Sequence, residues 1–278
     1  MTVLVGRQES VHGPDGVEIG LVTAGSGPPL LLVHGGMTRR TRWAPIWAGL
    51  TACHRVTAMD RRGRGASGDT AAYALDREFD DVHAVADHLA ASAPEGIDVF
   101  GHSIGAVCAL GAAARGAPIR RLALYEPPGP QTVTRDWIDR VSDWISSGRP
   151  DRAMGSFLVE IVGLDGQTVI SLRDSPAAED AVPIVENTMV REAEALLAVD
   201  VVGLTAGVTV PVLLMVGDRS PGWAATVTSR LRQDLPGVTL TVLDGHGHEA
   251  VDTAPGLVVA RLDRFFAGTE RVGPRGST

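Results

Sequence analysis

The pentapeptide Gly101-His102-Ser103-Ile104-Gly105 constrains the fold of this chain more than any other feature. An apolar run at residues 97–100 precedes it, and an Ala-rich stretch at 106–114 follows it. This G-x-S-x-G pattern fits a strand that turns sharply into a helix, because the two glycines remove clashes at a strained turn. The turn exposes the serine hydroxyl beside the helix N-terminus, where N–H groups can stabilise an oxyanion. We therefore predict Ser103 as a nucleophile, the alternative being an ordinary Gly-rich turn.

A base must take the proton of a serine hydroxyl before the oxygen can attack a substrate. His248 is the best candidate, because it lies in a polar, Gly-rich loop that follows the expected strand at 239–243. His246 in the same loop is the rival.

Short apolar runs alternate with amphipathic stretches along much of the chain. Continuous runs such as Leu30-Leu31-Leu32-Val33 are typical of strands that are covered on both faces, as in a mostly parallel sheet. The pattern predicts an α/β protein. We expect strands at 18–23, 30–33, 56–60, 97–100, 119–125, 210–216 and 239–243. We expect helices at 76–91, 104–114, 224–235 and 257–266.

The alternation stops at Pro127-Pro128-Gly129-Pro130. Apolar residues then recur at helical spacing over residues 135–145, 152–162 and 184–197. We predict a helical lid at residues 129–205, inserted between the core segments 1–128 and 206–278. The final residues, 271–278, are expected to be a frayed tail.

Composition excludes several function classes. The sequence has 25 arginines and no lysine, so Schiff-base chemistry and the lysine-containing phosphate loop are excluded. The net charge is −8 and no Arg-rich stripe is interleaved with aromatic residues, which argues against a nucleic-acid partner.

We find no apolar run suited to a signal peptide or a membrane helix, so we expect a cytoplasmic protein with no membrane contact. Cys53 and Cys108 are expected to be buried, small apolar residues in a reducing compartment.

Four motifs in this order resemble those of the α/β-hydrolase superfamily, and the resemblance covers nearly the whole chain. They are His34-Gly35-Gly36, the turn from Asp60 to Ser67, the pentapeptide around Ser103, and Gly247-His248 followed by Pro255. The resemblance implies the α/β-hydrolase fold, with an eight-stranded, mostly parallel sheet and helices on both faces. It also implies an oxyanion hole formed by the backbone N–H groups of Gly36 and Ile104.

The turn at residues 63–68 also satisfies G-x-G-x-x-G, which is a dinucleotide-binding pattern when a helix follows it directly. The next residues, 69–73, do not continue as a convincing helix, so a bound phosphate would lack a helix N-terminus. We expect no cofactor and no metal.

The sequence departs from the common family pattern at the third catalytic residue, the carboxylate that orients the histidine. Ser220 stands where the family usually has an acid. Asp218, two residues earlier, is one replacement. Glu126, which ends the apolar strand and precedes two prolines, is the other. We favour Glu126, because the arrangement resembles that of some haloalkane dehalogenases and of the fungal zearalenone lactonases.

A serine at the nucleophile position favours acyl transfer, by attack on an ester, a lactone, a thioester or an activated C–C bond. We therefore expect a serine hydrolase that cleaves a medium-sized, mostly apolar ester or lactone through an acyl-enzyme. A lyase, epimerase or cyclase with His248 as proton carrier is an alternative, and a ligand-binding protein on a hydrolase scaffold is another. The partner is a small-molecule substrate, and homodimerisation stays open.

Substrate contacts are expected from Met37, Trp137 and Trp223. Such aromatic residues at helical spacing are also typical of a simple lid core. Arg39, Arg40 and Arg42 could recognise a substrate carboxylate, but a solvated face at the start of a helix is the preferred interpretation.

Overall fold

The computed structural model describes residues 3–173, 175–235 and 237–269. Within these ranges one eight-stranded sheet has the order β1-β2-β4-β3-β5-β6-β7-β8. The pairs β1–β2 and β2–β4 are antiparallel, and all other pairs are parallel. This confirms the predicted eight-stranded, mostly parallel sheet. The strands are β1 (Arg7–His12), β2 (Glu18–Ala24), β3 (Pro29–Val33), β4 (Arg55–Met59), β5 (Ile97–His102), β6 (Ile119–Tyr125), β7 (Val212–Gly217) and β8 (Val238–Leu243).

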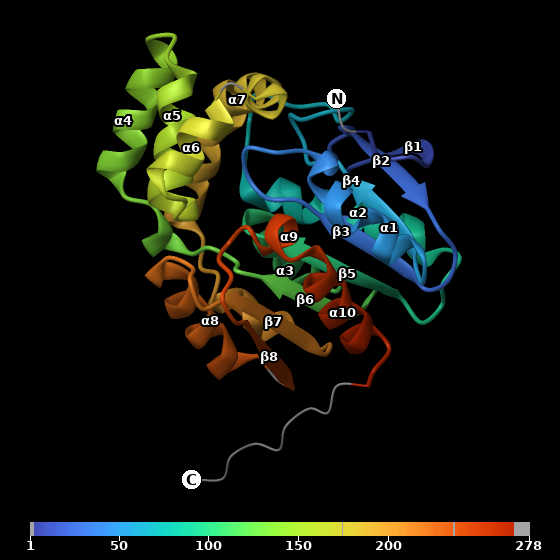
Figure 1. The fold of residues 1–278 in the computed structure, drawn as a ribbon. Helices are drawn as coiled ribbons and strands as arrows, with labels where there is room; N and C mark the ends of the chain where they lie inside the picture. Colours follow the sequence, from blue (N-terminus) through green and yellow to red (C-terminus); the bar gives the residue numbers. More distant parts are fainter. Residues whose placement is uncertain (1–2, 174, 236, 270–278) are drawn as a thin grey trace.

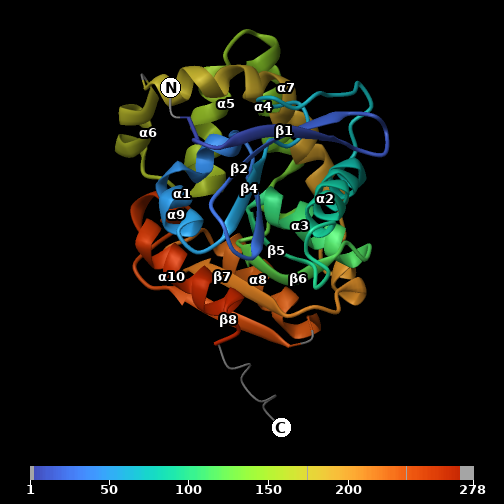
Figure 2. The same ribbon diagram turned by 90° about the vertical axis from the view of Figure 1, so that its right-hand side faces the viewer.

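Helices cover both faces of the sheet (Figures 1 and 2). One layer contains α2 (Leu75–Ala90), α3 (Ile104–Ala114) and α8 (Gly222–Asp234). The other contains α1 (Ala44–Thr51), α9 (Ala250–Thr253) and α10 (Pro255–Phe266). Side chains of a strand alternate between the two layers, so Leu31 packs in the first and Leu32 in the second. This double burial explains the continuous apolar runs in the sequence.

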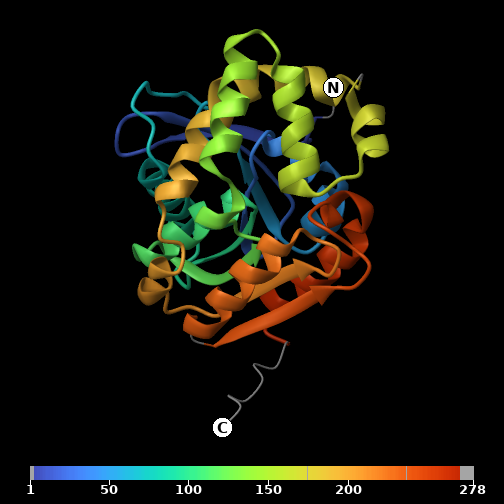
Figure 3. The same cartoon turned by 90° about the vertical axis from the view of Figure 1, so that its left-hand side faces the viewer.

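Among the described residues between β6 and β7, four helices and a π-helical turn form what we call the inserted helices (Figures 1 and 3). They are α4 (Arg135–Ser146), α5 (Pro150–Ser156), the π-helical turn Phe157–Val162, α6 (Gly166–Arg173) and α7 (Pro176–Ala198). Short 3₁₀ segments lie at Arg40–Trp43, Pro130–Thr132 and Gly203–Gly207. In the part of the chain that the structure describes, no helix is both long and apolar enough to cross a bilayer.

Several local predictions are wrong or too short. The expected helix at 152–162 is divided, because α5 gives way to the π-helical turn, which ends at Gly163 with φ +85°. The helix expected at 184–197 starts earlier and runs through Pro183. Cys53 is exposed, whereas Cys108 is buried as expected. The predicted tail at 271–278 lies outside the described residues.

Candidate active site

Ser103 lies at the sharp turn between β5 and α3, with φ 56° and ψ −132°. Glycines are required on both sides of it. A Cβ on Gly101 would lie 2.6 Å from the Cα of Ala106, and one on Gly105 would lie 2.3 Å from the carbonyl oxygen of His34. The backbone N–H of Ser103 donates to the carbonyl of Tyr125 at 2.9 Å. The sequence therefore forms the strained strand–turn–helix unit that the pentapeptide predicts.

Glu126 and His248 form a buried hydrogen-bonded pair. Nδ1 of His248 lies 2.6 Å from Oε2 of Glu126, and both residues are almost fully shielded from solvent. The other carboxylate oxygen, Oε1, accepts from the Gly217 N–H at 2.7 Å and from the Ser220 hydroxyl at 2.5 Å. Ser220, which occupies the family's usual acid position, therefore helps to orient the carboxylate of Glu126, the residue directly after β6.

The ends of β5 and β6 hold the loop that carries His248. His102, directly before Ser103, stacks on Tyr125 at a centroid distance of 4.9 Å and contacts the His248 ring at 4.5 Å. Its Nε2 donates to the His248 carbonyl at 3.1 Å, and the Tyr125 hydroxyl donates to the Gly247 carbonyl. Burial, together with the neighbouring His248, holds the pKa of His102 well below its usual value. A neutral His102 therefore places its proton on Nε2 for this bond.

The loop after β3 presents a backbone N–H group to the same site. The Arg61 N–H donates to Nε2 of His34 at 3.0 Å, so the proton of the neutral ring is on Nδ1, which donates to the Gly35 carbonyl at 2.8 Å. Burial and the positive charges of Arg61 and Arg64 hold the pKa of His34 well below its usual value. In a trans peptide the C=O and the next N–H point in opposite directions. The bonded Gly35 carbonyl therefore directs the Gly36 N–H to the opposite side of the peptide.

A cavity of about 40 Å³ brings most of the predicted site residues together. Ser103, Gly36 and Ile104 line it, and so do the three expected substrate contacts, Met37, Trp137 and Trp223. Ile104 is the first residue of α3, so its N–H has no acceptor within the helix. Trp223 meets the His248 ring edge to face at 5.5 Å. No hydrogen bond joins the Ser103 hydroxyl to His248 among the described residues.

The two rival residues lie apart from this arrangement. Asp218 accepts a hydrogen bond from the Gly245 N–H at 2.7 Å, and its side chain is exposed. Nδ1 of His246 lies 3.4 Å from the Thr253 hydroxyl. The structure pairs neither of them with Glu126 or His248.

Arginines 39, 40 and 42 do not form a solvated face, and that prediction is wrong. Each is partly buried and pairs with a carboxylate of the chain: Arg39 with Asp180 at 2.7 Å, Arg40 with Asp60 at 3.4 Å, and Arg42 with Asp252 at 2.6 Å. None of the three lines the cavity beside Ser103. These pairs are internal contacts that compete with recognition of a substrate carboxylate.

The glycine-rich turn at 63–68 does not open a helix, since α2 begins only at Leu75. Instead the Asp60 carboxylate holds the turn by accepting from the N–H group of Ala66 at 2.9 Å. Its other oxygen accepts from the N–H group of Arg40, outside the turn, at 2.8 Å. The described residues contain no group of three or more His, Cys, Asp and Glu side chains that could hold a metal ion.

Sequence reasoning missed Glu192, on α7, which lines the cavity and is 5% exposed. It falls between Met189 and Leu196 at helical spacing, so it occupies a position on the apolar face of the helix. A carboxylate on the apolar face of a predicted helix is the sequence signal that could have identified Glu192.

The chain belongs to the alpha/beta hydrolase family, whose model matches residues 30–262. It is 28% identical to N-formylmaleamate deformylase of Pseudomonas putida over 229 residues, covering 81% of this chain and 83% of that protein. It is 26% identical to 2-(acetamidomethylene)succinate hydrolase of Mesorhizobium japonicum over 266 residues, covering 90% of this chain and 94% of the relative.

Solved structures show the same fold. An alpha/beta hydrolase from Sphaerobacter thermophilus has a TM-score of 0.80 and 31% identity, covering 93% of this chain and all of the other. The enol-lactonase from Burkholderia xenovorans has a TM-score of 0.73 at 21% identity, covering 94% of this chain and all of that enzyme. The fold and the family place the chain among hydrolytic enzymes.

Proposed function

We propose that this chain is a serine hydrolase in which Ser103 is the nucleophile, His248 the general base and acid, and Glu126 the orienting carboxylate. The 2.6 Å hydrogen bond between Glu126 and His248, beside the strained serine turn, carries the proposal. A buried carboxylate on Nδ1 keeps the second ring nitrogen, Nε2, unprotonated and available as a base. The alternative of a binding protein gives no reason for a strained serine at this turn. Labelling and hydrolysis distinguish the hydrolase from a lyase, an epimerase or a cyclase.

In the proposed reaction, the Ser103 oxygen attacks the substrate carbonyl while His248 takes its proton. The N–H groups of Gly36 and Ile104 stabilise the resulting oxyanion. His248 then gives the proton to the leaving oxygen, the bond to it breaks, and an acyl-enzyme remains. Water then attacks this ester while His248 takes its proton. His248 gives that proton to the Ser103 oxygen as the ester bond breaks, which releases the acid and the free serine. The imidazole approaches the hydroxyl in the substrate complex, since such catalytic hydrogen bonds tighten on binding.

We further propose an ester or lactone as substrate, because the cavity wall is mainly apolar. A cavity of about 40 Å³ has room for about three water-sized groups, so the enclosed acyl part is short and the rest of a medium-sized substrate extends beyond it. Because the two relatives are named for N-formyl and acetamido compounds, compounds of these two kinds should also be tested as substrates. We propose that the inserted helices act as a lid over this site, and a cytoplasmic location stays a prediction from the sequence.

A fluorophosphonate probe followed by intact-mass measurement tests the mechanism. One label is expected on the wild-type chain and none on Ser103→Ala, and the same substitution should abolish hydrolysis of p-nitrophenyl acetate. A folded wild-type chain that takes no label, or label retained in Ser103→Ala, would refute the covalent mechanism.

A further inference from the structure

Glu192 is the one charged residue among the described residues that line the cavity beside Ser103. Its carboxylate is buried at the contact between α7 and the core, where Oε1 accepts from Nη2 of Arg61 at 2.5 Å and from the Arg64 guanidinium. Burying a carboxylate is unfavourable unless cations and hydrogen bonds compensate for the lost water. The two guanidinium groups provide that compensation at one oxygen.

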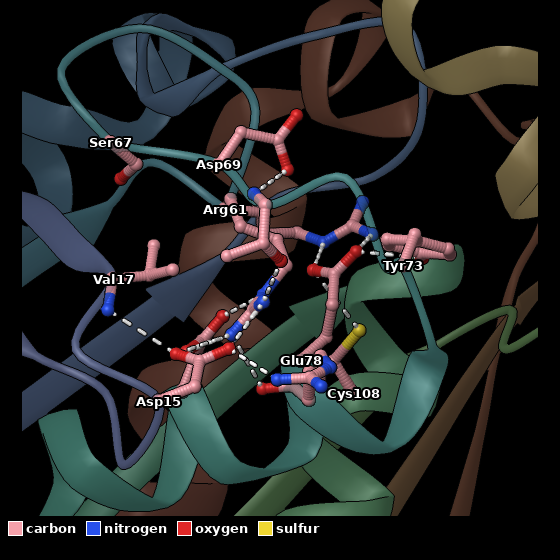
Figure 4. Close-up of polar contacts among 12 residues, drawn as sticks. Asp15, Val17, Arg61, Ser67, Asp69, Tyr73, Glu78 and Cys108 are labelled. Atoms are coloured by element: carbon pink, nitrogen blue, oxygen red, sulfur yellow. Dashed lines mark hydrogen bonds and ion pairs between the residues drawn. The ribbon is translucent and has the colours of Figure 1, made fainter.

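Further contacts fix the guanidinium groups in place. Nε and Nη2 of Arg61 donate to Glu78 at 2.7 and 2.5 Å, and the Tyr73 hydroxyl donates to the same carboxylate at 2.8 Å (Figure 4). Nη1 of Arg64 donates to the Arg62 carbonyl at 2.7 Å. Two arginines therefore face two carboxylates in a charge-balanced cluster, and Glu192 is held in one orientation.

The second oxygen of Glu192 has a different environment. Oε2 accepts no hydrogen bond from any described residue, and a Cβ built on Gly36 would lie 3.4 Å from it. Oε2 is therefore next to Gly36, one of the two residues of the proposed oxyanion hole, and the same Cβ would lie 3.9 Å from Cγ2 of the other, Ile104. Oε2 is not among the fully buried atoms that lack a partner, so it keeps some contact with the cavity that Glu192 lines. A ligand that fills the cavity without a donor leaves this oxygen unsatisfied, and a ligand that supplies the donor removes that cost.

Sheet order identifies the part of a substrate that meets Oε2. Gly36 follows β3 and His248 follows β8, and these strands lie on opposite sides of β5, which carries Ser103. The leaving group lies next to His248, because that residue protonates it. Oε2, beside Gly36, consequently faces the acyl part.

We propose that Glu192 is a specificity-determining residue that accepts a hydrogen bond from a hydroxyl, ammonium or N–H group close to the scissile carbonyl on the acyl side. The inference rests on the proposed serine hydrolase function and deepens it. It assigns the site to esters or lactones of short hydroxy or amino acids. Simple aliphatic acyl groups leave Oε2 unsatisfied, and acyl groups with a second carboxylate are repelled by it.

Methyl lactate and methyl isobutyrate form the test pair, since they differ by a hydroxyl in place of a methyl group. Hydrolysis is followed by pH-stat titration, and the readout is the ratio of their kcat/KM values. We expect the wild type to prefer methyl lactate by about tenfold or more, the usual effect of a hydrogen bond to a charged group. Glu192→Gln should lower this ratio by about tenfold, because the arginines retain the amide oxygen and the NH₂ group then faces the substrate.

Glu194→Gln is the matched control, because Glu194 is on the same helix, half-exposed, and only loosely paired with Arg135 at 3.6 Å. It should leave the ratio unchanged. L-Alanine methyl ester provides a second readout, because its ammonium group can only donate and should lose more in Glu192→Gln than methyl lactate does. A general structural defect would lower all three kcat/KM values in parallel.

An unchanged ratio in Glu192→Gln, with turnover that still requires Ser103, would overturn this inference and leave the proposed function standing. Labelling of Ser103 without turnover of methyl lactate would also overturn it. Failure of the wild type both to label and to hydrolyse any ester would overturn the two together. If thermal unfolding shows that Glu192→Gln does not fold, Glu192→Asp replaces it. The shorter side chain keeps the charge but moves the carboxylate away from the substrate, so an unchanged ratio refutes the inference.

Discussion

Replacement of Glu126 by glutamine tests the assignment of the acid directly. Oε1 of Glu126 accepts two hydrogen bonds, from the Gly217 N–H and from the Ser220 hydroxyl. In Glu126→Gln the amide oxygen keeps that position, because an NH₂ group cannot accept from these donors. The amide nitrogen then faces Nδ1 of His248, where Oε2 lies 2.6 Å away in the wild type.

An NH₂ donor at this position selects the wrong tautomer of the histidine. Nδ1 must accept, so the ring proton moves to Nε2, which can no longer take the proton of Ser103. The variant also loses the negative charge that stabilises the imidazolium. Amide replacement of a triad carboxylate elsewhere lowers kcat by about 10⁴-fold, equivalent to about 5.4 kcal/mol. We expect a loss of that order here, with little effect on folding because Gln preserves shape.

The assay is hydrolysis of p-nitrophenyl acetate, measured as kcat/KM at near-neutral pH together with the rate of fluorophosphonate labelling. Asp218→Asn is the matched control. Its side chain is exposed and bonds to Gly245 rather than to His248, so we expect a change of about twofold or less. If Glu126→Gln keeps activity within tenfold, or if Asp218→Asn is the crippled variant, the tautomer argument is wrong.

Two further predictions concern stability. Gly105→Ala should destabilise the fold by about 3 kcal/mol or more in urea unfolding, because its Cβ would lie 2.3 Å from two backbone oxygens, whereas Gly222→Ala, in open space, should change stability by less than about 1 kcal/mol. Comparable losses in both would refute this. The hydrogen bond from Arg62 lowers the pKa of Asp15 from 3.8 to about 2, so the stability it contributes is present above pH 3.8 and is lost as the pH falls towards 2. The difference in unfolding free energy between wild type and Asp15→Asn, about 1 kcal/mol after allowance for partial exposure, should shrink over that range; a constant difference would contradict the assignment.

The parallel core was accessible from the sequence because its signals are local. A strand buried on both faces is a continuous apolar run, and the turn around Ser103 needs glycines at fixed spacing. The edge strand β1 escaped prediction, since its side chains alternate between exposed and half-buried positions and it has few apolar residues. The helix α6 was missed for a related reason, because it shows no strong apolar stripe at helical spacing.

The part of the site that escaped prediction depends on contacts between distant residues. Arg61 and Glu192 are 131 positions apart, and their pairing follows from how α7 packs on the core. Propensity and periodicity describe neighbours along the chain and cannot rank partners at that separation. By contrast, Gly36, Ile104, Ser103 and His248 each lie in a short motif, so the sequence predicts them individually.

Backbone strain links these residues in one further way. Among the described residues, the non-glycine residues with positive φ are Met37, Ser103 and Glu126, at 57°, 56° and 47°. They follow β3, β5 and β6, which are adjacent strands of the sheet, so the strain is concentrated at one edge. Each such residue costs about 1–2 kcal/mol, and strain of this kind persists only where the surroundings enforce it. Here the N–H groups of Ser103 and Glu126 are anchored to the neighbouring strands, at the carbonyls of Tyr125 and Met215. The fold therefore maintains an unfavourable backbone conformation at the proposed nucleophile, at its proposed acid and at a residue of the cavity wall. Packing alone would not require strain at these three positions.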